Sequence, residues 1–366
     1  MSAFPCKMQK LAFDVTIIFN QGVIMATTTW NRGRDADSPT EVPAQGWKDI
    51  ALRVKDEISK DRLSLISAAM AYYALFAFVP AISSVVLIYA LISDPNGISE
   101  LMAKFSNILP SEMVTLIDDQ LTTLASKASS TLGWSAVLAL LVALWSASKG
   151  SKAIMEALNI IYDEEDKRGF IKQNLLAIGM TFLAAFFGLC ALGVIVVIPA
   201  VANYVGISKG FQFGVTAASW IILLGLFAVY LAFVYRFGPD RRKAKWKWVS
   251  AGAVIAAGFW AIASALFSWY ASEFGNFNKT YGSLGAIIVL MTWFYLSSFI
   301  ILIGGEVNAE LEHQTKKDST VGSSKPMGMR DATMADNVGE SSRKPSVFKR
   351  LLNKFRSKKK SIINGV

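Results

Sequence analysis

The chain has 366 residues, of which 53% are hydrophobic, and a formal net charge of +10. Its mean hydropathy of +0.40 is too high for an ordinary soluble domain. One histidine and two cysteines leave a zinc or haem site without enough ligands, so we expect no cofactor and no metal.

Six long runs without a charged side chain define the fold class. They are Leu63–Ser93, Ala128–Ser148, Gln173–Ser208, Gly210–Tyr235, Trp248–Ser272 and Thr280–Gly305. A bilayer core about 30 Å thick needs about 20 apolar residues in a helix. The pattern predicts an all-α, polytopic integral membrane protein with six transmembrane helices and amphipathic interfacial helices. The predicted spans are about 65–92, 130–148, 174–203, 211–235, 249–271 and 283–304.

The region before the first span divides into two parts. Residues 26–45 are polar, and residues 1–45 are expected to be a disordered leader. Within it, Met25 is favoured over Met1 as the true start, which would make 1–24 an extension. From Trp47 onward, apolar residues recur at helical spacing through Ile58, which predicts an amphipathic helix at the cytoplasmic membrane face.

The first span contains Pro80 near its middle. Proline removes one backbone hydrogen bond and clashes with the preceding turn, so the helix should kink or break there. The loop that follows carries two apolar stripes within 98–128, which predict two short amphipathic helices. They are interpreted either as a surface-lying linker or as a lid or docking element for a periplasmic protein. The loop after the second span repeats this pattern from Ile154 to Tyr162.

The residues after the sixth span also divide into two parts. Residues 313–342 are polar and rich in Gly and Ser, and they are predicted to be a disordered linker. Residues 343–366 place apolar side chains on one helical face among many Lys and Arg. This basic amphipathic tail is expected to bind anionic lipids of the inner leaflet.

Lys and Arg alternate between rich and poor loops along the chain. Basic residues are dense before the first span, in the second and fourth loops and after the sixth span, and sparse in the other loops. The positive-inside rule therefore predicts that both termini are cytoplasmic. Since this rule and the basic tail account for the net charge, no nucleic-acid partner is expected.

Five sequence motifs point to a known family. They are AAMAYYALFAFVP at 68–80, WSASKG at 145–150, YRFGPDRR at 235–242, TYGSLG at 280–285 and GGEVNAE at 304–310. Over residues 46–312 the chain resembles the YihY/BrkB family of bacterial inner-membrane proteins (UPF0761 type), once labelled ribonuclease BN. The resemblance implies a multi-pass protein of the bacterial inner (plasma) membrane, and it implies little about activity.

The residue inventory argues against an enzyme. Metal-dependent RNA hydrolysis needs clustered carboxylates or histidines around a metal, and metal-free cleavage needs an acid–base pair. The one histidine is His313, and the acidic residues of the loops predicted to be cytoplasmic show no ligand spacing. Ion-coupled transport usually leaves an ionisable group deep in a span. No uncharged run has such a group near its middle.

The leading hypothesis is a protein that handles or transports a lipid-like or amphiphilic molecule at the cell envelope. Pro80 and Pro199 would open a cavity, and basic residues at the cytoplasmic helix ends would meet an anionic headgroup of a membrane lipid. Glu306 and Asn308 either pair with Arg236 or Lys149, or serve a substrate or gating role. The candidate functional residues are Tyr72, Tyr73, Pro80, Lys149, Arg236, Pro239, Arg241, Arg242, Tyr281, Gly282, Gly285, Glu306 and Asn308.

The alternative is a non-enzymatic membrane scaffold that recruits envelope partners through residues 98–128 and the basic tail. A homo-oligomer is compatible with both hypotheses. The sequence leaves the substrate, the transport direction, the energy coupling and the oligomeric state open.

Overall fold

The computed structural model describes residues 32–92, 129–204, 209–273 and 283–340. Within these ranges the chain is helical and carries one isolated β-bridge, between Ala244 and Thr320. The elements are η1 (Pro39–Glu41), α2 (Ala44–Lys60), α3 (Leu63–Ile92), α6 (Ser129–Ile161), α7 (Phe170–Tyr204), α8 (Lys209–Phe237), α9 (Trp246–Glu273), α11 (Ser283–Glu312) and α12 (Thr333–Asp336). The all-α prediction is confirmed for the described residues.

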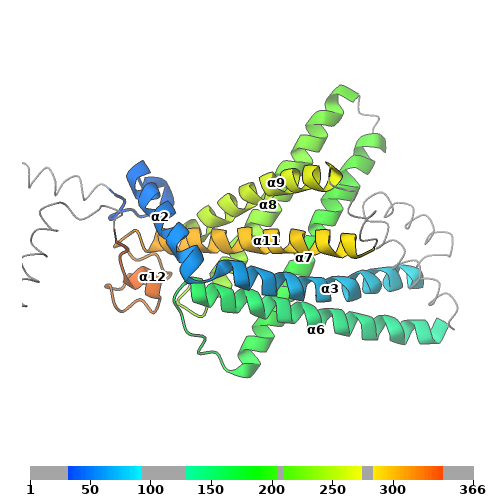
Figure 1. Cartoon of the computed structure of the whole chain (residues 1–366), viewed down its shortest axis with the longest axis horizontal. Coiled ribbons are helices and arrows are strands. Elements are labelled where there is room, and N and C mark those ends of the chain that lie inside the picture. The colour runs from blue at the N-terminus through cyan, green and yellow to red at the C-terminus, as the bar shows by residue number, and fades with distance from the viewer. Residues whose placement is uncertain (1–31, 93–128, 205–208, 274–282, 341–366) are drawn as a thin grey trace, which may run out of the picture.

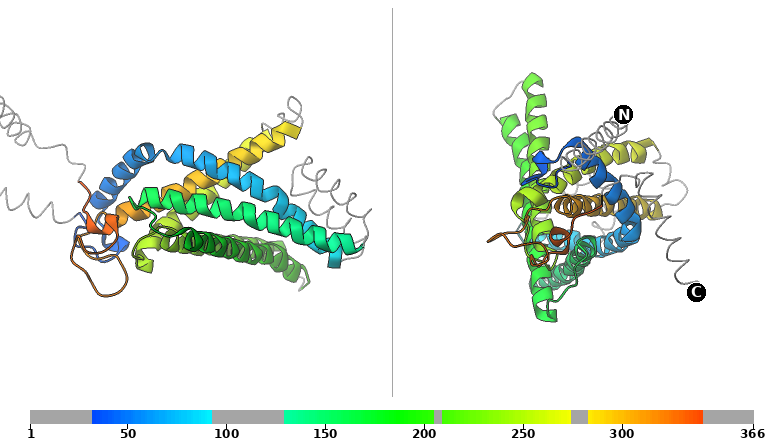
Figure 2. Two further views of the ribbon diagram at one scale, coloured as in Figure 1. Left: turned by 90° about the horizontal axis from the view of Figure 1, so that it is seen from below. Right: turned by 90° about the vertical axis from the view of Figure 1, so that its left-hand side faces the viewer.

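The six long helices form a ring in which each contacts the next, in the order α3, α6, α7, α8, α9, α11 and back to α3. They come together at the end that carries α2 and α12 and diverge toward the opposite end (Figures 1 and 2). The largest fully buried side chains, among them Trp248, Tyr162 and Leu302, belong to residues near the convergent end. We call this the polar end, because the charged loops and the charged end of α11 also meet there.

Within the described part of the chain, four helices contain stretches long and apolar enough to cross a membrane. They are Phe170–Ile195, Gly214–Phe237, Trp246–Tyr270 and Ile287–Glu312. In an apolar window of 18 residues within each stretch, at most 28% is buried inside the protein. Large apolar side chains such as Leu189, Trp220 and Trp269 are exposed. Apolar surface on this scale requires a hydrocarbon solvent, which a bilayer supplies.

The polar end depends on a close approach of α9 to α11. A Cβ atom added at Gly252 would lie 2.1 Å from the Gly304 carbonyl oxygen, and one added at Gly304 would lie 2.4 Å from the Tyr235 hydroxyl. That hydroxyl donates a hydrogen bond of 2.7 Å to the carbonyl of Ile301. Small residues at such crossings let two helix backbones approach. The contact therefore joins α8, α9 and α11.

Helices α3 and α6 are more continuous than the sequence indicated. Of the two outcomes predicted at Pro80, a kink or a break, the break does not occur, because α3 continues through Pro80 as one element. The predicted span 130–148 and the amphipathic segment after it form one helix of 33 residues, α6. No Pro interrupts the chain between them, and the α6 residues beyond the span pack their apolar side chains into the core at Leu158 and Ile161.

Helix α2 confirms the predicted amphipathic helix but gives its apolar face another partner. Ile50 and Val54 are buried in the protein core, and α2 packs against α11. From the sequence, this apolar face was predicted to contact the membrane. Burial against α11 instead fixes α2 over the polar end.

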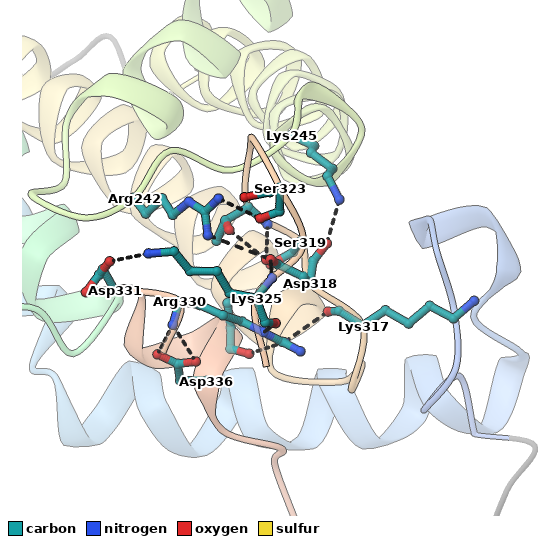
Figure 3. Close-up of polar contacts among 12 residues, drawn as sticks. Arg242, Lys245, Lys317, Asp318, Ser319, Ser323, Lys325, Arg330, Asp331 and Asp336 are labelled. Atoms are coloured by element: carbon teal, nitrogen blue, oxygen red, sulfur yellow. Dashed lines mark hydrogen bonds and ion pairs between the residues drawn. The ribbon is translucent and has the colours of Figure 1, made fainter. Parts of the chain in front are cut away.

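Residues 32–45 and 313–340, which were predicted to be disordered, have a defined structure. Residues 313–340, which we call the C-terminal cover, pack over the polar end. Arg330 is 4% exposed and donates hydrogen bonds to the carbonyls of Lys316 and Ala335, at 2.7 and 2.6 Å. It also donates to the carbonyl of Lys317, at 3.2 Å (Figure 3). Thr315 bonds the carbonyl of Ala36, at 2.7 Å. These polar side chains form a hydrogen-bonded core, which a composition-based prediction of disorder does not detect.

Several predictions fall outside the described residues. They concern the leader up to residue 31, the helices within 98–128, the basic tail at 343–366, and the candidate residues Tyr281 and Gly282.

The close helix approach predicts which glycines tolerate a methyl group. Gly252→Ala or Gly304→Ala should lower the free energy of unfolding by about 1–3 kcal/mol, because backbone atoms would have to move apart. Gly258→Ala is the control, since a Cβ there meets nothing within 4 Å. Thermal unfolding of the purified protein in detergent measures both. Equal melting temperatures for Gly252→Ala and Gly258→Ala would contradict this packing.

Candidate functional site

The last two turns of α11 bury an unusual set of polar side chains. Glu306, Asn308 and Glu312 are 0% exposed and Glu310 is 1% exposed. A buried charge is costly unless it is paired and hydrogen-bonded. The partners of these four side chains therefore indicate what each one does.

Glu312 is neutralised by Arg241 from the loop between α8 and α9. The two side chains form two hydrogen bonds, of 3.0 and 2.5 Å, and are 0% and 1% exposed. The guanidinium also lies 3.9 Å from the centre of the ring of Tyr162, the residue directly after α6. Burial alone would lower the pKa of Arg241, but the Glu312 carboxylate raises it above its ordinary value. The pair joins α6, the α8–α9 loop and α11.

Glu310 is neutralised by Arg53 of α2. The Arg53 Nε atom donates to the Glu310 carboxylate, and its Nη2 atom donates to the Gln314 side chain at 2.9 Å. The His313 Nδ1 atom lies 3.5 Å from the same carboxylate. This pair fastens α2 to α11.

Asn308 links α11 to α9 where the two helices cross. Its side-chain oxygen accepts from the Gly252 amide at 2.7 Å, and its nitrogen donates to the Val249 carbonyl at 2.9 Å. Both partners are on α9. The expected pairing of Asn308 with Arg236 or Lys149 is therefore not formed.

Glu306 has no partner among the described residues, and neither carboxylate oxygen receives a hydrogen bond. The expected ion pair with Arg236 or Lys149 is absent here too. The Tyr162 hydroxyl is a second buried atom without a hydrogen bond in this region. Glu306 thus differs from Glu310 and Glu312, which are on the same helix and equally buried.

An acidic group lies at the corner between α2 and α3. Burial, followed by the negative charge of Glu57, raises the pKa of Asp61 to about 6. The charges of Asp163 and Glu310 act in the same direction. Lys60 is paired with Glu57 at 2.8 Å, which occupies the nearest ammonium group.

The loop after α6 is tied to the loop after α8. Arg168 bonds Asp166 at 2.8 Å and donates to the carbonyl of Gly238 at 3.0 Å. The Asp240 amide donates to the Asn159 side chain at 2.7 Å. These contacts hold the end of α6 and the loop after it against the loop that contains Arg241.

A second set of cations lies over aromatic rings, and we call it the cation–aromatic belt. Its pairs are Lys149 over Trp145 at 3.9 Å, Lys152 over Phe170 at 5.5 Å, Arg236 over Trp246 at 4.3 Å and Lys243 over Phe237 at 4.5 Å. Trp145, Phe170 and Trp246 are 61%, 79% and 45% exposed. Among the described residues, no carboxylate forms a salt bridge with any of these cations. The belt leaves its charge available to an anion.

Arg241 and Arg242 were expected at an anionic headgroup, and the structure places both in internal contacts. Arg242 donates to the Ser323 carbonyl at 2.9 Å and lies 3.8 Å from Asp318 of the cover (Figure 3). Pro239 is buried beside them, in the same loop. The loop is short and lies under the cover, which turns these guanidinium groups inward.

The other described candidates lie on the membrane-length helices. Tyr72 is exposed on α3, and its ring packs beside those of Tyr73 and Phe76 at 5.7 and 4.6 Å. Gly285 is buried near the start of α11. Neither group contacts the charged end of α11.

Sequence reasoning missed Arg53, Tyr162, Arg168, Glu310 and Glu312 as members of the site. One signal was available, because Glu306 and Glu310 are four residues apart and share a helix face. The identity of their partners depends on tertiary packing and left no local signal.

The Arg241–Glu312 pair yields a direct test. Arg241→Ala should lower the free energy of unfolding by about 3–5 kcal/mol, because it leaves the Glu312 carboxylate buried and uncompensated. Lys325→Ala is the matched control, since the Lys325–Asp331 pair of 2.9 Å is exposed and should matter little. Thermal or denaturant unfolding in detergent measures both variants. Similar small effects would show that the buried pair does not hold this end together.

Comparison with known proteins identifies the family. The sequence model of the family described as virulence factor BrkB matches residues 54–327. The ribonuclease-like protein YfkH of Bacillus subtilis is 34% identical over 260 residues, covering 69% of this chain and 90% of YfkH. The UPF0761 membrane protein PBPRA3489 of Photobacterium profundum is 26% identical over 301 residues, covering 78% and 88% of the two chains.

A third relative, the UPF0761 membrane protein IL2447 of Idiomarina loihiensis, is 28% identical over 216 residues, covering 57% of this chain and 71% of the relative. No solved structure matches the chain. The match to the family model covers more than half of the sequence and includes all of the charged end of α11. Together with the exposed apolar helices, these findings show that the chain belongs to the BrkB family and is a multi-pass protein of the bacterial inner membrane.

Proposed function

We propose that the protein crosses the inner membrane six times and handles or moves an amphiphile with an anionic headgroup, which binds at the cation–aromatic belt. The observation that carries the proposal is the belt itself, with its four cations over mostly exposed aromatic rings. Aromatic side chains and long basic side chains concentrate where a membrane meets water. A negatively charged headgroup at that depth would meet unpaired cations.

The topology part of the proposal rests on helix length and charge. Each of the six long helices contains all or most of one uncharged run, and the Lys- and Arg-rich loops lie at the polar end. The positive-inside rule then assigns the polar end to the cytoplasm. Both termini would share that side.

Reporter fusions test this topology. Green fluorescent protein fused after Val366 should fluoresce in cells, because it folds on the cytoplasmic side. Alkaline phosphatase inserted within 93–128 should be active, because it requires the periplasm. The reverse pattern, or an inactive insertion beside a non-fluorescent fusion, would refute the orientation.

The belt is better suited to ligand binding than the other cations of the polar end. Arg53 and Arg241 are occupied by Glu310 and Glu312, and Arg242 by the cover. By contrast, the Nε and Nη1 atoms of Arg236 are buried without a hydrogen-bond partner. A phosphate or carboxylate oxygen would supply the acceptor that these atoms lack.

The proposed function is non-enzymatic, although one relative is named ribonuclease-like. Metal-dependent hydrolysis requires free carboxylates that converge on a metal. Here Glu310 and Glu312 are already bound by guanidinium groups, which compete with a metal for the same oxygens. Among the described residues, no group of three or more His, Cys, Asp or Glu side chains converges around Glu306.

Lipid transfer in reconstituted vesicles tests the function. Wild-type protein should increase the movement of a fluorescent phosphatidylglycerol between leaflets, above protein-free vesicles. Lys149→Ala with Arg236→Ala should reduce that movement about tenfold or more, since two charge-assisted contacts are lost.

The matched control is Lys48→Ala with Lys55→Ala, which removes two exposed positive charges from α2 and should leave transfer unchanged. Transfer at the protein-free level for the wild type would exclude anionic-lipid movement. Equal losses in both double variants would show that net charge, and not the belt, is responsible.

A further inference from the structure

Glu306 is a buried carboxyl group within a helix that is long enough to cross a membrane. It lies in the stretch Ile287–Glu312, is 0% exposed, and has no hydrogen bond at either oxygen within the described chain. Ionisable groups in such positions are costly and are typically retained for function. Burial of a bare carboxylate without any partner is the least favourable arrangement available to it.

Acidic side chains dominate the surroundings of Glu306. The charged groups that act on it most strongly are Asp61, Glu310, Glu57 and Asp163, all of which are acidic. Each of these is a full negative charge when ionised, so an ionised Glu306 would add to a region that is already negative.

Nearby cations do not offset this, because other carboxylates already bind them. Arg53 binds Glu310, Arg241 binds Glu312, and Lys60 binds Glu57. The titratable and charged groups around Glu306 come from five parts of the chain. They are Arg53, Glu57, Lys60, Asp61 and Arg62 of α2 and its junction with α3; Tyr162 and Asp163 directly after α6; Tyr235 of α8; Arg241 of the loop after α8; and Glu310, Glu312 and His313 at the end of α11.

A second buried group at the same place also lacks a partner. The buried hydroxyl of Tyr162 has no geometric hydrogen-bond partner among the described residues, and the charges that act on it are those of Arg241, Glu312 and Glu306. Buried polar atoms are nearly always hydrogen-bonded in native proteins, so a carboxylate and a hydroxyl left without partners indicate an unfilled hydrogen-bonding position. The described residues contain no group of three or more His, Cys, Asp or Glu side chains that could hold a metal ion. The smallest cation that satisfies the site is a proton.

We propose that Glu306 is a proton-binding site inside the polar end, occupied when α2, α6 and α11 are packed together. The carboxylic acid is neutral and carries one O–H donor, which removes the charge and supplies a donor to a region of acceptors. Loss of the proton would place a further negative charge beside Asp61 and Glu57. Release therefore requires the corner between α2 and α3 to move away from α11.

This inference does not depend on amphiphile binding, because protonation is measured without any transport assay. It also identifies an ionisable group that the sequence pattern did not place inside a span. Glu306 directly follows the last uncharged run. Its burial results from the packing of the helices at the polar end, which the sequence pattern does not reveal.

Infrared spectroscopy of the full-length protein in lipid nanodiscs tests the proposal. At pH 7.5 the wild type should show a C=O stretching band of a protonated carboxyl group, and Glu306→Gln should lack it. Asp61→Asn is the control and should retain the band, because Asp61 has a pKa of about 6 and is ionised at that pH. Circular dichroism establishes that each variant is folded. A wild type without the band, or a band that survives in Glu306→Gln, would overturn the proposal.

A chemical label decides the matter if Glu306→Gln does not fold. Dicyclohexylcarbodiimide reacts with protonated carboxyl groups in apolar surroundings, and peptide mass spectrometry locates the adduct. In wild-type protein the adduct should form at Glu306 and not at the ion-paired Glu310 or Glu312. A protonated-carboxyl band accompanied by an adduct elsewhere would assign the proton to another residue.

Thermal unfolding separates a proton from a metal ion. A carboxyl group that is protonated in the folded state and ionised in the unfolded state makes the protein less stable as pH rises. The wild-type melting temperature should therefore fall between pH 5 and pH 8 more steeply than that of Glu306→Gln. At pH 7.5, exchanging choline chloride for sodium chloride should change neither protein. Stabilisation of the wild type alone by sodium would identify a metal ion as the occupant and refute the proton site.

Discussion

The polar end depends on charge compensation in a place from which water is excluded. Arg241 and Glu312 are both almost completely buried, and their mutual attraction offsets the loss of hydration only because the geometry is bidentate. The same condition applies to Arg53 and Glu310. Three otherwise separate segments, α2, α11 and the loop before α9, are positioned by these two pairs. Every other feature of this end, from the glycine crossing to the C-terminal cover, requires α11 to remain where the pairs hold it.

The sequence was informative where structure follows from local composition. Hydrocarbon-length apolar runs predicted all six long helices, and apolar spacing from Trp47 to Ile58 predicted α2. It failed where burial depends on distant partners. The polar composition of 313–340 indicated disorder, yet Arg330 and Thr315 are buried because their partners come from other parts of the chain.

The basic motif at 235–242 shows the same limit within eight residues. Arg236 and Arg241 look equivalent in the sequence, and both were expected to meet an anionic headgroup. In the structure the Arg241 guanidinium pairs with a buried carboxylate, while the Arg236 guanidinium stacks on the Trp246 indole and has no carboxylate partner among the described residues. Helix α8 ends at Phe237, so the two guanidinium groups belong to different local structures. Residue type alone could not separate a structural cation from an available one.

Helix α6 has a mechanical consequence of its own. At 33 residues it is about 50 Å long, which exceeds the hydrocarbon thickness by about 20 Å. A helix without an internal break behaves as a rod, so its two ends cannot move independently. If α6 tilts at the end where the helices diverge, Leu158 and Tyr162 at the polar end would therefore be displaced relative to the charged end of α11. A movement of the part of α6 that faces lipid would thus be coupled to a movement of the buried polar residues at its other end.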